Sequence, residues 1–321
     1  MILLGFCAGW SLITAAVHDG RPEGVLLAVL AATAGYAAGR ISGALLPVVA
    51  PCVGASAGLA LAVLMPDLAP GSRYTAPLGQ AGAVAALLAL STGAACCASW
   101  ATPVPALRLG LRALAAGITL TGAAIGSAEG CTAGAAVLLC SLAAGSMAHR
   151  GVGITGLALV AAAAAGTVWA VAAGALPGGL AQALTGRFDA HRVQLWQDAL
   201  RLAHRAPGLG VGPGRFGELS GSAPGVLPDG KPHSAPLQQL AEQGLVGVLL
   251  LMAVFCWVLH ALWRSPRSTP VALSAGAALT ALTVIASAGN ALSFTTVTAG
   301  AGLLAGWATA RPWAGEETLS A

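Results

Sequence analysis

Long apolar runs, separated by short polar connections, constrain this chain more than any other feature of its sequence. A helix needs ~20 mostly apolar residues to cross the hydrocarbon core of a membrane. About ten such runs occur, at roughly 2–17, 24–39, 43–65, 78–100, 107–127, 131–148, 153–176, 244–263, 271–289 and 291–310. We therefore predict an all-α polytopic membrane protein with about ten transmembrane helices, forming a single membrane domain over residues 1–321.

Charged residues are too scarce for a soluble protein. The chain has 15 Lys and Arg and 11 Asp and Glu among 321 residues, or 8%, and 57% of its residues are hydrophobic. An average soluble domain is roughly 25% charged. Disordered chains, in turn, are rich in charge and poor in apolar residues. Both of these classes are excluded.

The few cations indicate an orientation, because short cytoplasmic loops collect Lys and Arg. If the N-terminus is cytoplasmic, that side holds seven arginines, at positions 40, 108, 112, 150, 264, 267 and 311. The short loops on the other side then hold only Arg21 and Arg73. We therefore expect a multi-pass protein of the cytoplasmic membrane, with both termini in the cytoplasm.

One connection, residues 177–243, is far longer than the others. It separates seven predicted spans in 1–176 from three in 244–310, and it holds six of the cations and five of the acids. A connection of this length is usually functional or disordered. We interpret it as an extracytoplasmic loop that carries the chemistry.

The first part of the loop has the pattern of an amphipathic helix. Polar residues recur at steps of three or four, opposite an apolar stripe; the polar set is Arg187, His191, Gln194, Asp198, Arg201 and Arg205, and the stripe is Phe188, Leu195, Ala199 and Leu202. We expect this helix to lie at the membrane interface.

Arg192 departs from this pattern because it lies on the apolar stripe, four residues before Trp196. Its side chain either snorkels to lipid headgroups or points into a cavity at the membrane edge and binds a phosphorylated ligand. Arg187, at the start of the helix, is a candidate for the same ligand.

Two further segments of the loop carry candidate residues. In the segment Pro207–Phe216, four glycines, Gly212 and Gly214 among them, permit close approach of the backbone to a ligand, and Arg215 adds a cation; a plain turn is the alternative.

His233 precedes a helix that Ser234 can cap and in which Pro236 is tolerated. The positive end of that helix favours a neutral imidazole, which is able to accept a proton.

In this order, these segments resemble the O-antigen ligase family of membrane glycan transferases. The resemblance rests on Arg187, Arg192-x-x-x-Trp196, Pro207-x-x-Gly210-x-Gly212-x-Gly214-x-Phe216, His233-Ser234 and Glu242-x-Gly244-x-x-Gly247. It covers about 60 residues closely, and the N-terminal 150 residues agree only as hydrophobic spans. The chain departs from the family pattern in two respects: Ser234 replaces the usual Asn, and about one pair of spans is missing before the loop.

The resemblance implies transfer of a glycan from a polyprenyl-diphosphate carrier to an acceptor hydroxyl outside the cytoplasmic membrane. Arginines stabilise the charge that develops on the diphosphate, and a neutral His accepts the proton of the hydroxyl. His233 and Arg192 are thus the catalytic candidates, and Arg187, Arg215, Trp196, Gly212 and Gly214 the substrate-binding ones. We expect no cofactor and no metal. The expected partners are the carrier-linked glycan, membrane lipids and a glycan, lipid or protein acceptor, with no nucleic acid.

Other functions remain open at this point. A repeat-unit polymerase or a protein O-oligosaccharyltransferase of the same family would have a similar loop. A transporter in envelope glycan export would place ionisable residues inside its spans, and almost none occur there, which disfavours that class. A non-catalytic assembly partner would need neither His233 nor the arginines.

Overall fold

The structure is a computed structural model that describes residues 2–68, 77–147, 149–176, 190–220 and 231–311. All regular structure in these ranges is helical, in twelve α-helices and one short 3₁₀ helix. They are α1 (Ile2–His18), α2 (Glu23–Leu45), α3 (Val49–Leu68), α4 (Pro77–Ala101), α5 (Pro105–Ala124), α6 (Ala128–Ala144), α7 (Arg150–Ala172), α9 (Ala190–Arg205), α10 (Phe216–Leu219), α11 (Ala235–Trp263), α12 (Thr269–Ala288), η1 (Ala291–Ser293) and α13 (Thr295–Thr309). The all-α prediction is confirmed.

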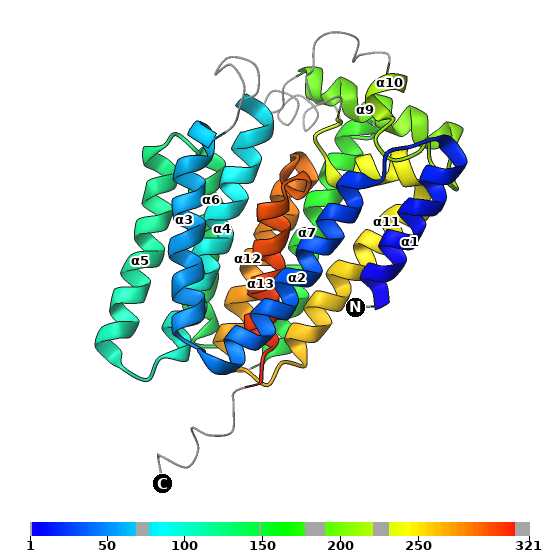
Figure 1. Cartoon of the computed structure of the whole chain (residues 1–321). Helices are drawn as coiled ribbons and strands as arrows, with labels where there is room; N and C mark the ends of the chain where they lie inside the picture. Colours follow the sequence, from blue (N-terminus) through cyan, green and yellow to red (C-terminus); the bar gives the residue numbers. More distant parts are fainter. Residues whose placement is uncertain (1, 69–76, 148, 177–189, 221–230, 312–321) are drawn as a thin grey trace.

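The helices form one bundle with two distinct ends (Figure 1). Helices α9 and α10 cross one end, which we call the α9 end, and the chain leaves α13 at the other, which we call the C-terminal end. At the C-terminal end, Arg150 donates hydrogen bonds from Nη1 to the Ser265 carbonyl at 2.7 Å, and Arg267 donates from Nη2 to the Gly43 carbonyl at 2.5 Å. Several of the predicted cytoplasmic arginines therefore gather at one end of the bundle.

Within the described residues, five helices are long and apolar enough to cross a membrane, which makes the chain a multi-pass membrane protein. They are α2, the Ala81–Ala101 part of α4, α7, α11 and α12. Helices α1 and α6 and the Val49–Leu64 part of α3 are apolar but shorter. Helix α13 has only 15 residues, and α5 carries Arg108 and Arg112. The predicted count of about ten spans is therefore not confirmed.

The helix of the eighth predicted span begins before its apolar run, at the position that Ser234 and Pro236 predicted. Helix α11 starts at Ala235, within the predicted loop, and bends at Gly244, where the span was predicted to begin. Ser234 occupies the N-cap position and a proline lies in the first turn, both as predicted. The Ser234 side chain, however, makes no cap hydrogen bond, so that part of the prediction is wrong.

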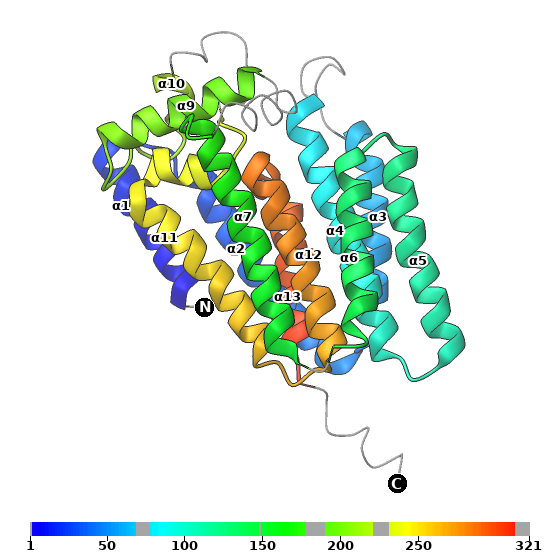
Figure 2. The same ribbon diagram turned by 180° about the vertical axis from the view of Figure 1, so that it is seen from behind.

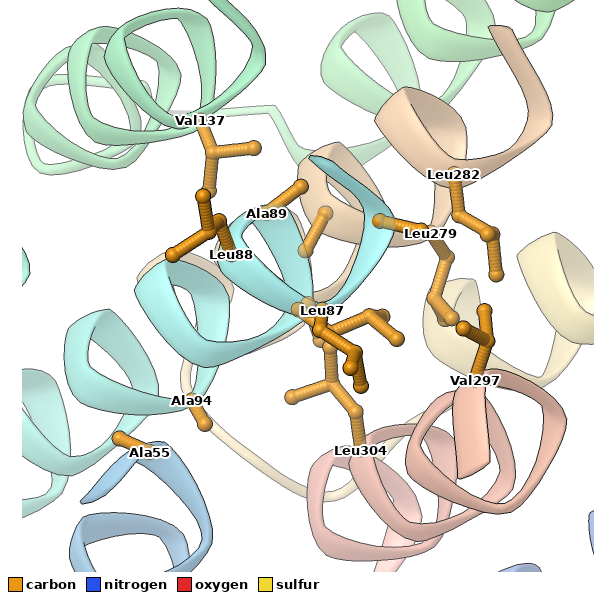
Figure 3. Packing of buried hydrophobic residues seen from close by; sticks show 14 of the residues in the cluster. Ala55, Leu87, Leu88, Ala89, Ala94, Val137, Leu279, Leu282, Val297 and Leu304 are labelled. Carbon is orange, nitrogen blue, oxygen red and sulfur yellow. The ribbon is translucent and has the colours of Figure 1, made fainter. Parts of the chain in front are cut away.

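Helices α4 and α12 form the centre of the bundle. In Figure 3, Leu88 of α4 points toward Val137 of α6, Leu87 lies above Leu304 of α13, and Leu279 of α12 faces the same core. A helix that is buried on every side must be apolar on every side. This explains why α4 has no polar face in its sequence.

Glycines permit α2 and α13 to pack backbone against backbone. A Cβ atom on Gly39 would lie 2.3 Å from the Leu303 carbonyl oxygen, and one on Gly302 would lie 2.3 Å from the Ala32 carbonyl oxygen. Small residues at such crossings allow close approach, which drives helix association in lipid. The abundance of glycine in the apolar runs is explained here by packing.

We expect Gly39→Ala to lower the thermal unfolding midpoint in detergent by roughly 5 °C, because the added methyl group overlaps backbone that cannot move away alone. Gly117 is the matched control: it also lies within a helix, α5, but a Cβ atom added to it would have no other atom within 4 Å. Gly117→Ala should leave the midpoint equal or slightly higher. A Gly39→Ala midpoint equal to that of Gly117→Ala would contradict this packing.

Helix α9 is amphipathic as predicted, but protein rather than lipid covers its apolar stripe. Leu195, Ala199 and Leu202 are buried in a cluster with residues of α7, of the first part of α11 and with Phe216. Asp198, predicted on the polar face, is also buried; its carboxylate accepts a hydrogen bond from Ser220 Oγ at 2.8 Å and pairs with Arg201. The apolar stripe therefore packs on the end of the bundle, and the position of this helix at the membrane interface stays a prediction.

Candidate ligand-binding site

The glycine-rich segment 207–216 packs against the bend of α11. At this bend the helix cannot pair its own backbone groups, and partners from elsewhere are required. Val211 and Gly212 donate from their N–H groups to the carbonyls of Ala241 and Glu242, each at 2.9 Å. Leu245 donates to the Pro207 carbonyl at 2.9 Å. The segment thus supplies hydrogen-bond partners for the backbone groups of α11 that are left unpaired at the bend.

The glycines of this segment are needed for close backbone contact. A Cβ atom on Gly210 would lie 2.4 Å from the Glu242 carbonyl carbon, and one on Gly212 would lie 2.8 Å from His18 Cβ. Both residues have positive φ angles, 70° and 97°. Of the predicted ligand-binding glycines, Gly212 therefore directs its N–H group into the protein, whereas Gly214 lines the cavity described next.

A cavity of about 460 Å³ opens beside the bend, between α1, α2, α11, η1 and α13. Its length is lined by apolar side chains of α2 and α11, including Val25, Val29, Leu250, Leu251 and Val254. Small residues of α13, such as Ala301 and Gly302, also line it. The greater part of the cavity is therefore suited to a hydrocarbon chain.

The end of the cavity near the glycine-rich segment is polar. The lining residues there are Arg21, Glu23, Lys231, Gln238, Gln239, Glu242, Gln243, Asn290 and Ser293. The N–H group of Arg21 donates to the Pro213 carbonyl at 2.7 Å, which ties the connection between α1 and α2 to this end. A ligand with a polar head and an apolar tail would match both parts of the cavity.

Glu242 is the buried carboxylate at this polar end. Gln238 Nε2 lies 3.4 Å from each of its carboxylate oxygens. The backbone N–H groups of Gly214 and Phe216 and the Lys231 side chain are its other polar neighbours. The sequence shows Glu242 only as the first position of the motif Glu242-x-Gly244-x-x-Gly247. It does not show that Glu242 contacts the glycine-rich segment.

His233 lies beside the polar end and is buried. Its φ angle is 49°, in the left-handed region that few side chains other than Asn, Asp and His adopt. Lys231 and Ala235, two residues before and two residues after it, both line the cavity. A strained backbone next to a cavity is typical of a functional position.

Arg192 extends from α9 to the end of α12. Its Nη1 donates to the Ala288 carbonyl at 3.0 Å, and Ala288 is the last residue of α12. A cation at this helix end is favourable. Asn290, two residues further on, lines the cavity, so the guanidinium lies near the cavity but is not among its lining residues.

The other predicted residues lie in different surroundings. Trp196 is completely buried in the cluster beneath α9, where it contacts protein and supports the helix. Arg215 donates from Nη1 to the His18 carbonyl at 2.6 Å and pairs with Glu218, which connects α10 to α1. Arg187 lies outside the described residues.

The cavity residues Arg21, Gln238 and Asn290 were not predicted from the sequence. They come from the connection between α1 and α2, from α11 and from the connection between α12 and η1, which meet only in the folded chain. Lys231 was counted only among the charges of the long loop, and Glu242 was noted as a loop charge and as a position of the family motif. The single signal available was that Arg21 is one of two cations in the short loops opposite the arginine-rich side.

Comparison with known proteins gives no match among protein-family models, curated proteins or solved structures.

Proposed function

We propose that this protein is a membrane glycosyltransferase that moves a glycan from a polyprenyl-diphosphate carrier to an acceptor hydroxyl. The observation that carries the proposal is the cavity with an apolar length and a polar end that holds Arg21 and Lys231. A polyprenyl diphosphate has the same division into a hydrocarbon tail and an anionic head. Of the motifs that resemble the O-antigen ligase family, Gly214, Glu242 and Gly247 line this cavity, and His233 lies between the lining residues Lys231 and Ala235.

The residues at the polar end have roles that suit this chemistry. Breaking the bond between sugar and phosphate leaves negative charge on the diphosphate, which Arg21, Lys231 and the nearby Arg192 would stabilise. Arg187, predicted on the same helix as Arg192, is a further candidate. His233 would take the proton of the acceptor hydroxyl as the oxygen attacks the sugar carbon. The diphosphate departs with the electron pair of the broken bond, so the step needs no oxidant or reductant.

We propose that the α9 end faces the outside of the cytoplasmic membrane and that both termini are cytoplasmic. The support is the gathering of arginines at the C-terminal end, since cytoplasmic loops collect such residues. In a variant without native cysteines, Leu219→Cys of α10, which is exposed, should react with an impermeant thiol reagent in intact cells. Met147→Cys, exposed near the C-terminal end, is the control and should react only after lysis. The reverse pattern would contradict this orientation.

Transport of the carrier-linked glycan is the second candidate. The observation that favours it is that neither His233 nor Arg192 lines the cavity directly. A transporter would bind the same lipid but would not need a base. Loss of transfer with normal lipid binding in His233 variants would therefore distinguish an enzyme from a transporter.

A bulky side chain in the apolar part of the cavity tests the proposal. We expect Val254→Trp to reduce at least tenfold the amount of polyprenyl-diphosphate glycan that copurifies with the protein, measured by mass spectrometry of lipid extracts, because the indole fills the space for the tail. Leu249→Trp is the matched control, since Leu249 lies on the same helix but is exposed on the outside of the bundle. Equal amounts of copurified carrier in both variants, or none in the wild type, would contradict the assignment.

A further inference from the structure

A second polar cluster lies at the C-terminal end of the bundle, which is the end opposite the polar part of the cavity. Trp100 lies at the end of α4, and Arg108 and Arg112 lie in the first half of α5. The Cζ atoms of Arg108 and Arg112 are 5.7 Å and 4.8 Å from the centroid of the Trp100 ring. Trp100 Nε1 donates to Ser141 Oγ at 3.0 Å, which fixes the ring against α6. Two guanidinium groups are thus held by one aromatic side chain.

No acid in the part of the chain that the structure describes pairs with either of these two arginines. Within the described residues, the ion pairs are Arg201 with Asp198 and Arg215 with Glu218, and none involves this cluster. Arg108 donates from Nη2 to the Thr102 carbonyl at 3.1 Å. The Nε atoms of both arginines are buried and lack a hydrogen-bond partner. Like charges four residues apart destabilise a helix, so an anion between them would be stabilising.

The surroundings of the cluster are those of the membrane surface. Helix α5 lies at the edge of the bundle, packed against α4 and α6 (Figures 1 and 2). Its neighbouring residues Leu107 and Leu109 are exposed, Leu109 by 70%. Tryptophan is enriched at the level of lipid headgroups, and arginine binds phosphate oxygens through paired donors.

We propose that Arg108, Arg112 and Trp100 form a binding site for the phosphate group of an anionic membrane phospholipid. The guanidinium groups bind the phosphate oxygens, and the exposed leucines of α5 contact the acyl chains. Free phosphate offers the same oxygens but no acyl chain, so the two sources are separable by experiment. The site is independent of the proposed transferase activity, because it lies at the opposite end of the bundle.

The test is titration of the purified full-length protein in detergent with phosphatidylglycerol, phosphatidylcholine or inorganic phosphate. We expect phosphatidylglycerol to bind more tightly than either of the others. Its affinity should fall about fivefold with Arg108→Gln or Arg112→Gln and about 25-fold with both, as expected for juxtamembrane cations. Arg40→Gln is the control, since Arg40 also lies near the C-terminal end but is exposed on α2, outside the cluster, and it should change the affinity less than about twofold.

Three outcomes would overturn the proposal. The first is equal affinity for phosphatidylglycerol and phosphatidylcholine. The second is a loss of affinity in the Arg40→Gln control as large as that in Arg108→Gln or Arg112→Gln. The third is that millimolar phosphate competes with bound phosphatidylglycerol as strongly as the free lipid does. Because the double variant carries less charge and could fold poorly, the Arg108→Lys, Arg112→Lys variant is tested as well. It keeps the charges but not the stacked, paired donors, and wild-type affinity in this variant would contradict the geometry.

Discussion

Replacement of His233 with alanine is expected to reduce glycan transfer by about 10²–10⁴-fold, the usual contribution of a general base. The reason is that an acceptor hydroxyl is a poor nucleophile until its proton is removed. The measurement is the rate at which cells expressing only the variant consume the carrier-linked glycan, followed by extraction and mass spectrometry. Carrier lipid should still copurify with the variant protein, because His233 is not among the residues that line the cavity.

His233→Asn is the matched control for this prediction. Asparagine tolerates the left-handed backbone conformation that His233 adopts at φ 49°, so the local structure is retained while the base is removed. We expect His233→Asn to be as inactive as His233→Ala at equal protein abundance. Full activity of His233→Asn would show that the position matters for backbone geometry alone and would remove His233 from the mechanism.

Replacement of Gly244 with alanine is expected to have the largest effect on stability. Gly244 has φ 69° and ψ −165°, a combination that is almost restricted to glycine, and its Cβ position lies 2.3 Å from the Gly208 carbonyl oxygen. The unfolding midpoint in detergent should fall by on the order of 5–10 °C, since strain and overlap together cost several kcal/mol. Both the bend of α11 and the attachment of the glycine-rich segment depend on this residue.

Gly126→Ala separates the effect of backbone strain from the effect of atomic overlap. Gly126 also has a positive φ angle, 77°, but no atom lies within 4 Å of its Cβ position. In this variant only the strain of the backbone should lower the free energy of unfolding, by about 1 kcal/mol. If Gly126→Ala and Gly244→Ala lowered the midpoint equally, the contact between Gly244 and the glycine-rich segment would contribute nothing to stability.

The sequence predicts those features of the fold that depend on neighbouring residues. The all-helical class follows from the apolar runs, and the beginning of α11 at Ala235 follows from Ser234 and the following proline. The bend at Gly244 coincides with the boundary that the apolar pattern indicated. Cation placement anticipates that arginines such as Arg150 and Arg267 gather at one end.

Features that depend on contacts between distant segments were missed. Asp198 has the spacing of an exposed polar residue, yet Ser220, 22 residues later, returns to cover it. The glycine-rich segment has the composition of a ligand loop, yet Gly212 pairs with Glu242 of the broken helix. In both cases the side chain or amide has a partner that no local periodicity reveals.

The cavity was not predictable for the same reason. Arg21 and Asn290 are separated by most of the chain, and neither has a distinctive sequence pattern around it. Only the packing of α2 against α13 and the bend of α11 bring them to one polar end. The motif around His233 lies beside the cavity, but many of the residues that line the cavity come from other parts of the chain.

Deletion of the gene, followed by measurement of polyprenyl-diphosphate-linked glycan, tests the central claim most directly. The account predicts that the carrier-linked glycan accumulates, that its transferred form is lost, and that the wild-type gene but not His233→Ala restores both. Unchanged levels of carrier-linked glycan after deletion would contradict the proposed reaction.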